Sequence, residues 1–196
     1  MSHERFVSLL DCVADLRAEG TLPIDITFDD GNVSDLSIAL PELSKRQLPA
    51  TFFLCSGRLQ SRNYLDAGAA RELVAAGMGI GSHGMHHRDW RMLDEAELID
   101  EISLARRELE DACGLPITKV AIPFGSYDRR VIGKVRAEGF SHVYTSDGGL
   151  AYRRAWLKPR NTLGVNSEKA DIENLLSQPW TRQLVRDVAR SYKMLR

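Results

Sequence analysis

Two neighbouring acids and a group of histidines are the residues of this chain best suited to chemistry. The acids are Asp29 and Asp30, at the end of I-D-I-T-F-D-D-G, and the histidines are His83, His86 and His87, in G-S-H-G-M-H-H. Adjacent carboxylates repel each other unless a proton or a cation lies between them. Two imidazoles plus one carboxylate form a three-ligand site with a position open for water, which is typical of catalytic zinc.

The spacing leaves the individual roles partly open. His83 and His87 are four residues apart, which brings two imidazoles to one ion where the chain makes a helical turn. His86 and His87 are adjacent and point apart, so we expect that one of them is not a ligand. The acid that does not bind the ion is suited to act as a general base on a water that attacks a carbonyl. Residue order alone does not decide which of Asp29 and Asp30 takes each role.

Strand and helix patterns alternate along the chain. Apolar runs predict strands at 24–29, 50–55, 78–83, 119–123, 141–146 and 157–165, and helical patterns fall at 4–18, 32–47, 66–76, 94–113, 129–138 and 168–177. Pro41 implies a break or a late start in the second helix. This alternation predicts an α/β domain with a mainly parallel sheet, whose chemistry collects after the carboxyl ends of the strands. The two acids, the histidines and P-F-G-S-Y-D follow the first, third and fourth strands.

Composition indicates one domain, residues 1–196, in a reducing compartment. The chain has 26 basic and 27 acidic residues and a net charge of -1, which gives no sign of nucleic-acid binding. The three cysteines, Cys12, Cys55 and Cys113, are odd in number and far apart, as expected for free thiols. With no signal-peptide pattern and no transmembrane segment in the sequence, we expect a cytoplasmic protein. The sequence predicts no oligomeric state.

The C-terminal segment predicts an amphipathic helix at about residues 179–196. Apolar Trp180, Leu184, Val188 and Tyr192 recur every four residues, with basic residues elsewhere. We expect a packing helix that closes the fold; the alternative is a helix that binds a partner or a membrane surface.

Three segments together resemble the polysaccharide deacetylases, the family 4 carbohydrate esterases that include chitooligosaccharide and peptidoglycan deacetylases. They are T-F-D-D-G at 27–31, S-H-G-M-H-H at 82–87 and I-P-F-G-S-Y-D at 122–128, in the order of the family. The resemblance covers residues 24 to about 163. It implies a distorted, incomplete (β/α) barrel of about six to seven mainly parallel strands. It also implies a bound divalent metal, most often Zn²⁺.

The resemblance assigns roles to the site residues. It implies that Asp29 is the general base, that Asp30, His83 and His87 hold the metal, and that His86 is not a ligand. The segment that begins at Pro123 is similar to the groove wall of the family, in which the backbone N–H of the next residue, here Phe124, helps to hold the oxyanion.

Two departures from the family pattern concern residues that assist catalysis. Many members have an arginine two residues before the proline, where this chain has Ala121, and a C-terminal histidine as general acid, which residues 157–165 lack. Lys158, Arg160 and Asn161 are the polar candidates there. Arg160 is expected at a strand end, where it would pair with Asp29 in place of the missing arginine or remain a surface residue. Asp147 is a candidate for binding sugar hydroxyls or a plain turn residue.

These observations lead to one functional expectation and two alternatives. We expect a metal-dependent hydrolase that removes an N-acetyl group from an amino sugar of a glycan or glycan precursor. A cytosolic location favours a lipid-linked or nucleotide-linked sugar as substrate. The first alternative is a metal- or sugar-binding pseudoenzyme, because the general acid and the base-orienting arginine are missing. The second is an iron oxygenase built on two histidines and a carboxylate, which leaves the second aspartate unexplained.

Overall fold

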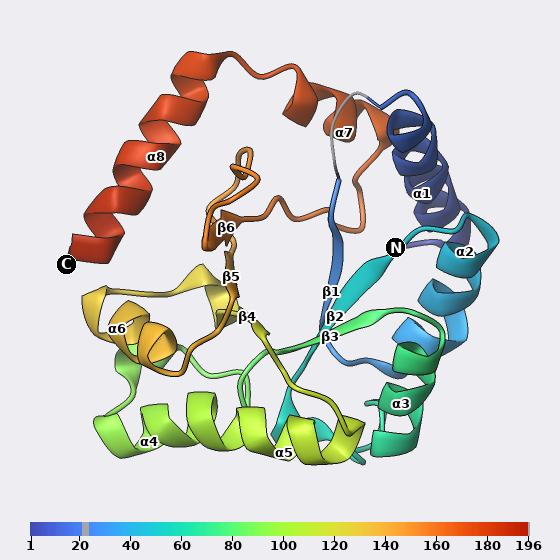
Figure 1. The fold of residues 1–196 in the computed structure, drawn as a ribbon. Coiled ribbons are helices and arrows are strands. Elements are labelled where there is room, and N and C mark those ends of the chain that lie inside the picture. The colour runs from blue at the N-terminus through green and yellow to red at the C-terminus, as the bar shows by residue number, and fades with distance from the viewer. Residues whose placement is uncertain (21–23, 196) are drawn as a thin grey trace.

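A computed structural model describes residues 1–20 and 24–195. Within these residues, six parallel strands form one sheet in sequence order: β1 (Ile26–Asp30), β2 (Ala50–Leu54), β3 (Gly79–Ser82), β4 (Lys119–Ala121), β5 (His142–Thr145) and β6 (Leu157–Pro159). Figure 1 shows the sheet inside a surround of helices. The sheet curls into a half-barrel, which confirms the prediction of an incomplete (β/α) barrel.

The helices follow the predicted pattern closely. They are α1 (His3–Ala18), α2 (Leu40–Lys45), α3 (Ala67–Ala75), α4 (Glu95–Ile99), α5 (Ala105–Cys113), α6 (Arg129–Ala137), α7 (Lys169–Leu176) and α8 (Trp180–Leu195). Single π-helical turns, η1 (Asp35–Ala39) and η4 (Asp100–Leu104), precede α2 and join α4 to α5. Short 3₁₀ turns, η2 (Ser56–Arg58), η3 (Trp90–Met92) and η5 (Pro123–Gly125), follow β2, β3 and β4.

Local signals explain where these helices begin and end. The helical conformation runs without a gap from residue 33 through η1 into α2, so the helix has no late start at Pro41. The irregularity near Pro41 is the π-helical turn that precedes it. A capping box between Asp94 and Glu97 starts α4. Gly114, at φ 72°, ends α5 in the left-handed conformation that glycine adopts without a steric penalty.

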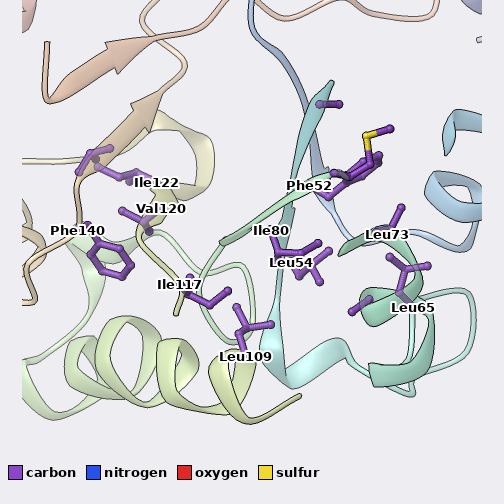
Figure 2. Close-up of a cluster of buried hydrophobic side chains, with 14 of the residues drawn as sticks. Phe52, Leu54, Leu65, Leu73, Ile80, Leu109, Ile117, Val120, Ile122 and Phe140 are labelled. Carbon is purple, nitrogen blue, oxygen red and sulfur yellow. The ribbon is translucent and has the colours of Figure 1, made fainter. Parts of the chain in front are cut away.

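The core lies between the sheet and the surrounding helices. Strand β2 is buried along its whole length, with Phe52, Phe53 and Leu54 fully inaccessible, as expected for a strand covered on both faces. Figure 2 shows side chains of this core from the strands, from α3 and α5, and from the segments that join them. This packed base gives the loops after the strands a rigid support.

Strand β6 is shorter than the predicted 157–165. It pairs with β5 only from Leu157 to Pro159. The chain then turns away, and the Asn161 side chain hydrogen-bonds the backbone of Gly149 on both its N–H and its C=O. The apolar pattern that predicted the longer strand gives no sign of this side-chain contact, which takes the place of further β-sheet hydrogen bonds.

Helix α8 lies at the edge of the molecule, with its C-terminal end next to α6 (Figure 1). Its predicted apolar stripe does not pack on the fold, because Trp180, Leu184, Val188 and Tyr192 are all exposed. Among residues 1–20 and 24–195, no helix combines the length and apolar character needed to cross a bilayer.

Candidate metal centre and active site

The carboxyl ends of neighbouring strands bring the predicted site residues together. Asp29 and Asp30 are the last residues of β1, paired in register with Phe53 and Leu54 of β2. His83 follows the last residue of β3, and η5 follows β4. Because the strands are parallel, these ends meet at one edge of the sheet.

Asp30, His83 and His87 form a compact group of possible metal ligands. One ligand atom from each lies within 4.8 Å of the others. The Nε2 atom of His87 is 3.6 Å from Oδ1 of Asp30, and the two imidazole centroids are 4.8 Å apart. Two imidazole nitrogens and a carboxylate oxygen suit Zn²⁺ or a similar divalent ion and leave coordination positions for water.

The His83 ring is held in the tautomer that a metal ligand requires. Its Nδ1 lies 2.7 Å from the carbonyl oxygen of Ala121, which only accepts hydrogen bonds, so Nδ1 carries the proton. Burial lowers the pKa of His83 below its ordinary value and favours the neutral ring. The lone pair of Nε2 is therefore available on the side that faces Asp29 and the other ligands.

Asp29 lies beside this group and is held by Arg160. The Arg160 Nη1 and Nη2 atoms donate to Oδ1 and Oδ2 of Asp29 at 2.6 and 2.8 Å. The Oδ2 atom of Asp29 is 3.7 Å from Nε2 of His83. Burial raises the pKa of Asp29, but the hydrogen bonds and charge of Arg160 outweigh it and hold the pKa below its ordinary value. Asp29 is therefore an ionised carboxylate next to the ligand group.

Arg160 comes from a different strand end than the family position for an arginine, which Ala121 occupies in this chain. The side chain of Ala121 is fully buried in β4, so the family position for an arginine holds no charge here. Arg160 follows the last residue of β6, at the end of the half-barrel that faces β1. Its Nη1 also donates to Thr27 Oγ1 of β1 at 3.0 Å.

Phe124 flanks the metal ligands from η5. Its ring centroid is 4.4 Å from that of His87, and 64% of the residue is exposed. Pro123 is buried and starts the turn, and Phe124 has φ 58°. Asp30 and His87 also have positive φ, at 78° and 57°. Three non-glycine residues in this sparsely populated region lie in one site, a clustering that strain at functional sites often shows.

The sequence of this chain matches a known protein family over most of its length. The model of the family described as polysaccharide deacetylase matches residues 19–143. The chain belongs to the polysaccharide deacetylase family. This finding confirms the resemblance drawn from the three sequence segments.

Named relatives and solved structures agree with the family. YxkH of Bacillus subtilis, whose name also refers to polysaccharide deacetylases, is 24% identical over 128 residues, 65% of this chain and 46% of YxkH. The chain spans between 28% and 54% of the length of the curated relatives it matches.

Two solved structures show that the fold is shared. The deacetylase PplD of Streptococcus pyogenes, in complex with acetate, has TM-score 0.77 and 18% identity, with 90% of this chain and 87% of PplD covered. IcaB of Ammonifex degensii has TM-score 0.74 and 21% identity, with 91% and 90% covered.

Glu101 supports the site of this polysaccharide deacetylase family member. The sequence did not reveal this role. The buried carboxylate of Glu101 accepts hydrogen bonds from the backbone N–H groups of Met85 and His86 and from Nε1 of Trp90. These contacts fix the loop that carries His87. A signal was present, because Glu101 lies on the buried face of its helix beside Leu98 and Ile102, where an acid requires partners.

Arg58 and Asp35 are two further charged residues of the site that the sequence did not reveal. Arg58 Nη1 donates to Oδ1 of Asp30, one of the possible ligands, at 2.7 Å. Asp35 is 5% exposed and accepts a hydrogen bond from the Asn32 N–H. Burial, with the charges of Asp30 and Asp29, raises the pKa of Asp35 to about 7. Arg58 reaches Asp30 across 28 positions of the sequence, so no local pattern predicts their contact. The hydrogen bond between Asn32 and Asp35 is local, but the sequence does not indicate that Asp35 is buried beside the two acids.

His86 and Asp147 lie away from the ligand group. A Cβ on Gly57 would lie 2.5 Å from the His86 ring, so this ring packs closely on the Gly57 backbone rather than joining the ligands. Asp147 accepts hydrogen bonds from Tyr127, Thr145 and Lys193, and its side chain is 7% exposed. The structure thus uses Asp147 to hold α8, with little of its carboxylate left for a sugar hydroxyl.

Proposed function

We propose that this chain is a metal-dependent hydrolase that removes an N-acetyl group from an amino sugar of a glycan or glycan precursor. The observation that supports it most is the combination of two separate carboxylates at one site. Asp30 belongs to the group of possible ligands, whereas Asp29 is paired with Arg160. A site that only binds metal has no need of the second, oriented acid.

Asp30, His83 and His87 are the residues that would hold the ion, and Zn²⁺ is the metal we propose. When bound, such an ion supplies a Lewis acid and lowers the pKa of a coordinated water. The fit is supported by the neutral His83, whose Nε2 lone pair is available because Nδ1 donates to Ala121.

The other residues of the site would perform the proton transfers and hold the substrate. Asp29, kept ionised by Arg160, would accept the proton of the attacking water and return it to the departing amine nitrogen, which balances the protons of the hydrolysis. The backbone N–H of Phe124 would donate to the oxyanion that develops on the acyl carbon. The exposed Phe124 ring and Pro123 would form one wall of the groove for the sugar.

An acetate-release assay over a panel of acetylated amino sugars and oligosaccharides, with and without a chelator, tests this function. The wild-type protein is expected to release acetate only in the presence of a divalent ion. Asp29→Asn is expected to bind zinc as the wild type does and to lose hydrolysis by roughly 100-fold or more, the usual contribution of a general base.

Asp25→Asn is the matched control, because Asp25 is an exposed acid just before the opposite end of β1. It should leave acetate release unchanged. Full activity of Asp29→Asn would refute the assigned base. Tight zinc binding by the wild type with no turnover on the whole panel would instead favour the metal-binding pseudoenzyme.

A further inference from the structure

Helix α8 is attached to the rest of the protein by its polar side. Gln183 bonds both the N–H and the C=O of Leu150, and Tyr152 donates to Asp187. Arg190, which is 8% exposed, bonds Asp187 and lies 3.7 Å from Asp147. Lys193 donates to the same Asp147. These polar contacts hold the helix, together with Met194, which packs against the hydrophobic core.

The opposite side of α8 is apolar and exposed. It consists of Trp180, Leu184, Val185, Val188, Tyr192 and Leu195, each between 54% and 77% exposed. We call these six residues the apolar face of α8. Tyr152 is also exposed, at 65%, but its hydroxyl binds Asp187 on the polar side of the helix. A surface helix normally turns its apolar side toward the core, and contiguous exposed apolar surface marks an interaction site.

The distribution of charged residues indicates which kind of partner binds the apolar face of α8. Residues 150–196 contain ten basic and four acidic side chains, whereas the remainder of the chain contains 16 and 23. Arg153, Arg154 and Arg182 are exposed and form no ion pair within residues 1–20 and 24–195. The basic residues that flank the apolar face are therefore available to a negatively charged surface.

A second copy of the chain fits the face poorly. Two α8 helices packed on their apolar faces would bring clusters of arginine together, and like charges across an interface oppose association. The face is also small: a helix of 16 residues is about 24 Å long and about 10 Å wide. Its footprint of roughly 250 Å² is well below the roughly 800 Å² that each partner of a stable complex buries.

We propose that the apolar face of α8 docks onto an anionic lipid surface. Trp180 at the start of the helix and Tyr192 in its last turn have the amphipathic rings that favour the boundary between headgroups and acyl chains. The leucine and valine side chains between them enter the acyl region, and Arg182 and the arginines of the 150–155 loop contact the headgroups. This proposal does not depend on the hydrolase activity.

Co-sedimentation with lipid vesicles tests the proposal. The wild-type protein is expected to bind vesicles of phosphatidylglycerol and phosphatidylcholine, to bind phosphatidylcholine alone much more weakly, and to dissociate at high salt. Leu184→Gln with Val188→Gln should reduce binding by at least tenfold. Arg182→Gln should reduce it roughly fivefold, the effect of about 1 kcal/mol per basic residue near an anionic surface.

Met92→Gln is the matched control, since Met92 is as exposed as Leu195 but lies in η3. Circular dichroism of all variants verifies that they are folded, and acetate release from a soluble substrate should be the same for each. The proposal would be overturned if the wild-type protein did not bind anionic vesicles, or if the double variant bound them as the wild type does. A dimer, detected by sedimentation equilibrium, that depends on Leu184 and Val188 while vesicle binding is absent would also overturn it.

Discussion

Arg160 and Asp29 meet through two parallel hydrogen bonds, although 131 residues separate them in the sequence. Arg160 follows the last strand of the half-barrel and Asp29 is the penultimate residue of the first, so the contact spans the open side of the curled sheet. A guanidinium fork matches a carboxylate at both oxygens, which fixes the direction of the carboxylate as well as its charge. The pair therefore joins the two ends of the sheet at the candidate base.

Replacing Arg160 tests this positioning role. Arg160→Lys keeps the charge but loses the fork, and Arg160→Met loses both. We expect kcat to fall roughly tenfold to a hundredfold for the lysine variant and further for methionine, because a misoriented base transfers protons poorly. Zinc affinity should change little, since the arginine contacts no proposed ligand. Calorimetry of zinc binding beside steady-state kinetics separates the two effects, and equal losses in both would contradict the assignment.

Removal of a ligand tests the metal site itself. His87→Ala takes one of three proposed ligands away, and we expect zinc affinity to fall by at least roughly a hundredfold. His86→Ala is the matched control, because it removes a neighbouring imidazole that packs on Gly57 instead. Competition with a chromogenic chelator measures both affinities. If the two variants lose zinc equally, the proposed ligand set is wrong.

Glu101 should affect the metal site from a distance. Glu101→Gln keeps the size of the side chain but replaces one of its two oxygens with an NH2 group, so at least one of the three donors loses its acceptor. We expect the free energy of unfolding to fall by about 1–3 kcal/mol and zinc affinity to fall roughly 10- to 100-fold. Urea unfolding of the metal-free protein and zinc calorimetry measure the two losses.

Glu108→Gln is the control for this variant, because Glu108 is exposed on α5 of the same continuous helix. Loss of stability in Glu101→Gln with unaltered zinc affinity would limit Glu101 to a structural role.

Asp147 gives a prediction about pH. Burial raises its pKa, but hydrogen bonds from Lys193, Thr145 and Tyr127 outweigh burial and hold the pKa below its ordinary value. A depressed carboxylate pKa stabilises the fold above the unfolded value of about 3.9, and this contribution is lost as pH falls through the folded pKa. Asp147→Asn should therefore lower the free energy of unfolding by roughly 1–3 kcal/mol near neutral pH.

The difference between wild type and Asp147→Asn should shrink below about pH 4. Denaturant unfolding of both proteins at several pH values measures it, and Asp111→Asn, an exposed acid on α5, serves as control. A difference that stays constant from neutral to acidic pH would show that the carboxylate acts through shape alone.

The sequence predicted those features that local patterns encode. Apolar runs located every strand, and the D-D-G and H-x-x-x-H segments located the acids and histidines that meet at the sheet edge. Features that depend on long-range contacts were less accessible. The pairing of Arg160 with Asp29 was one of two open alternatives. The roles of Arg58 and Glu101 were missed, because the sequence around a charged residue does not indicate which distant partner it binds.

Helix α8 shows a different limit. Its period of four predicted the helix correctly, yet the same period led to the expectation that the apolar stripe faces inward. Asp147 and Tyr152 reverse that orientation by binding the polar side. Periodicity defines the two sides of a helix, whereas polar partners elsewhere in the chain decide which side docks.

The left-handed conformations of Asp30, His87 and Phe124 carry a consequence for the response of this fold to heat. Each costs the native state about 1–3 kcal/mol relative to a relaxed backbone, and glycine would relieve the strain at all three positions. A library selected only for thermal tolerance is therefore expected to enrich glycine there. Its most stable members would be those that have lost two of the proposed metal ligands and the proposed wall of the groove.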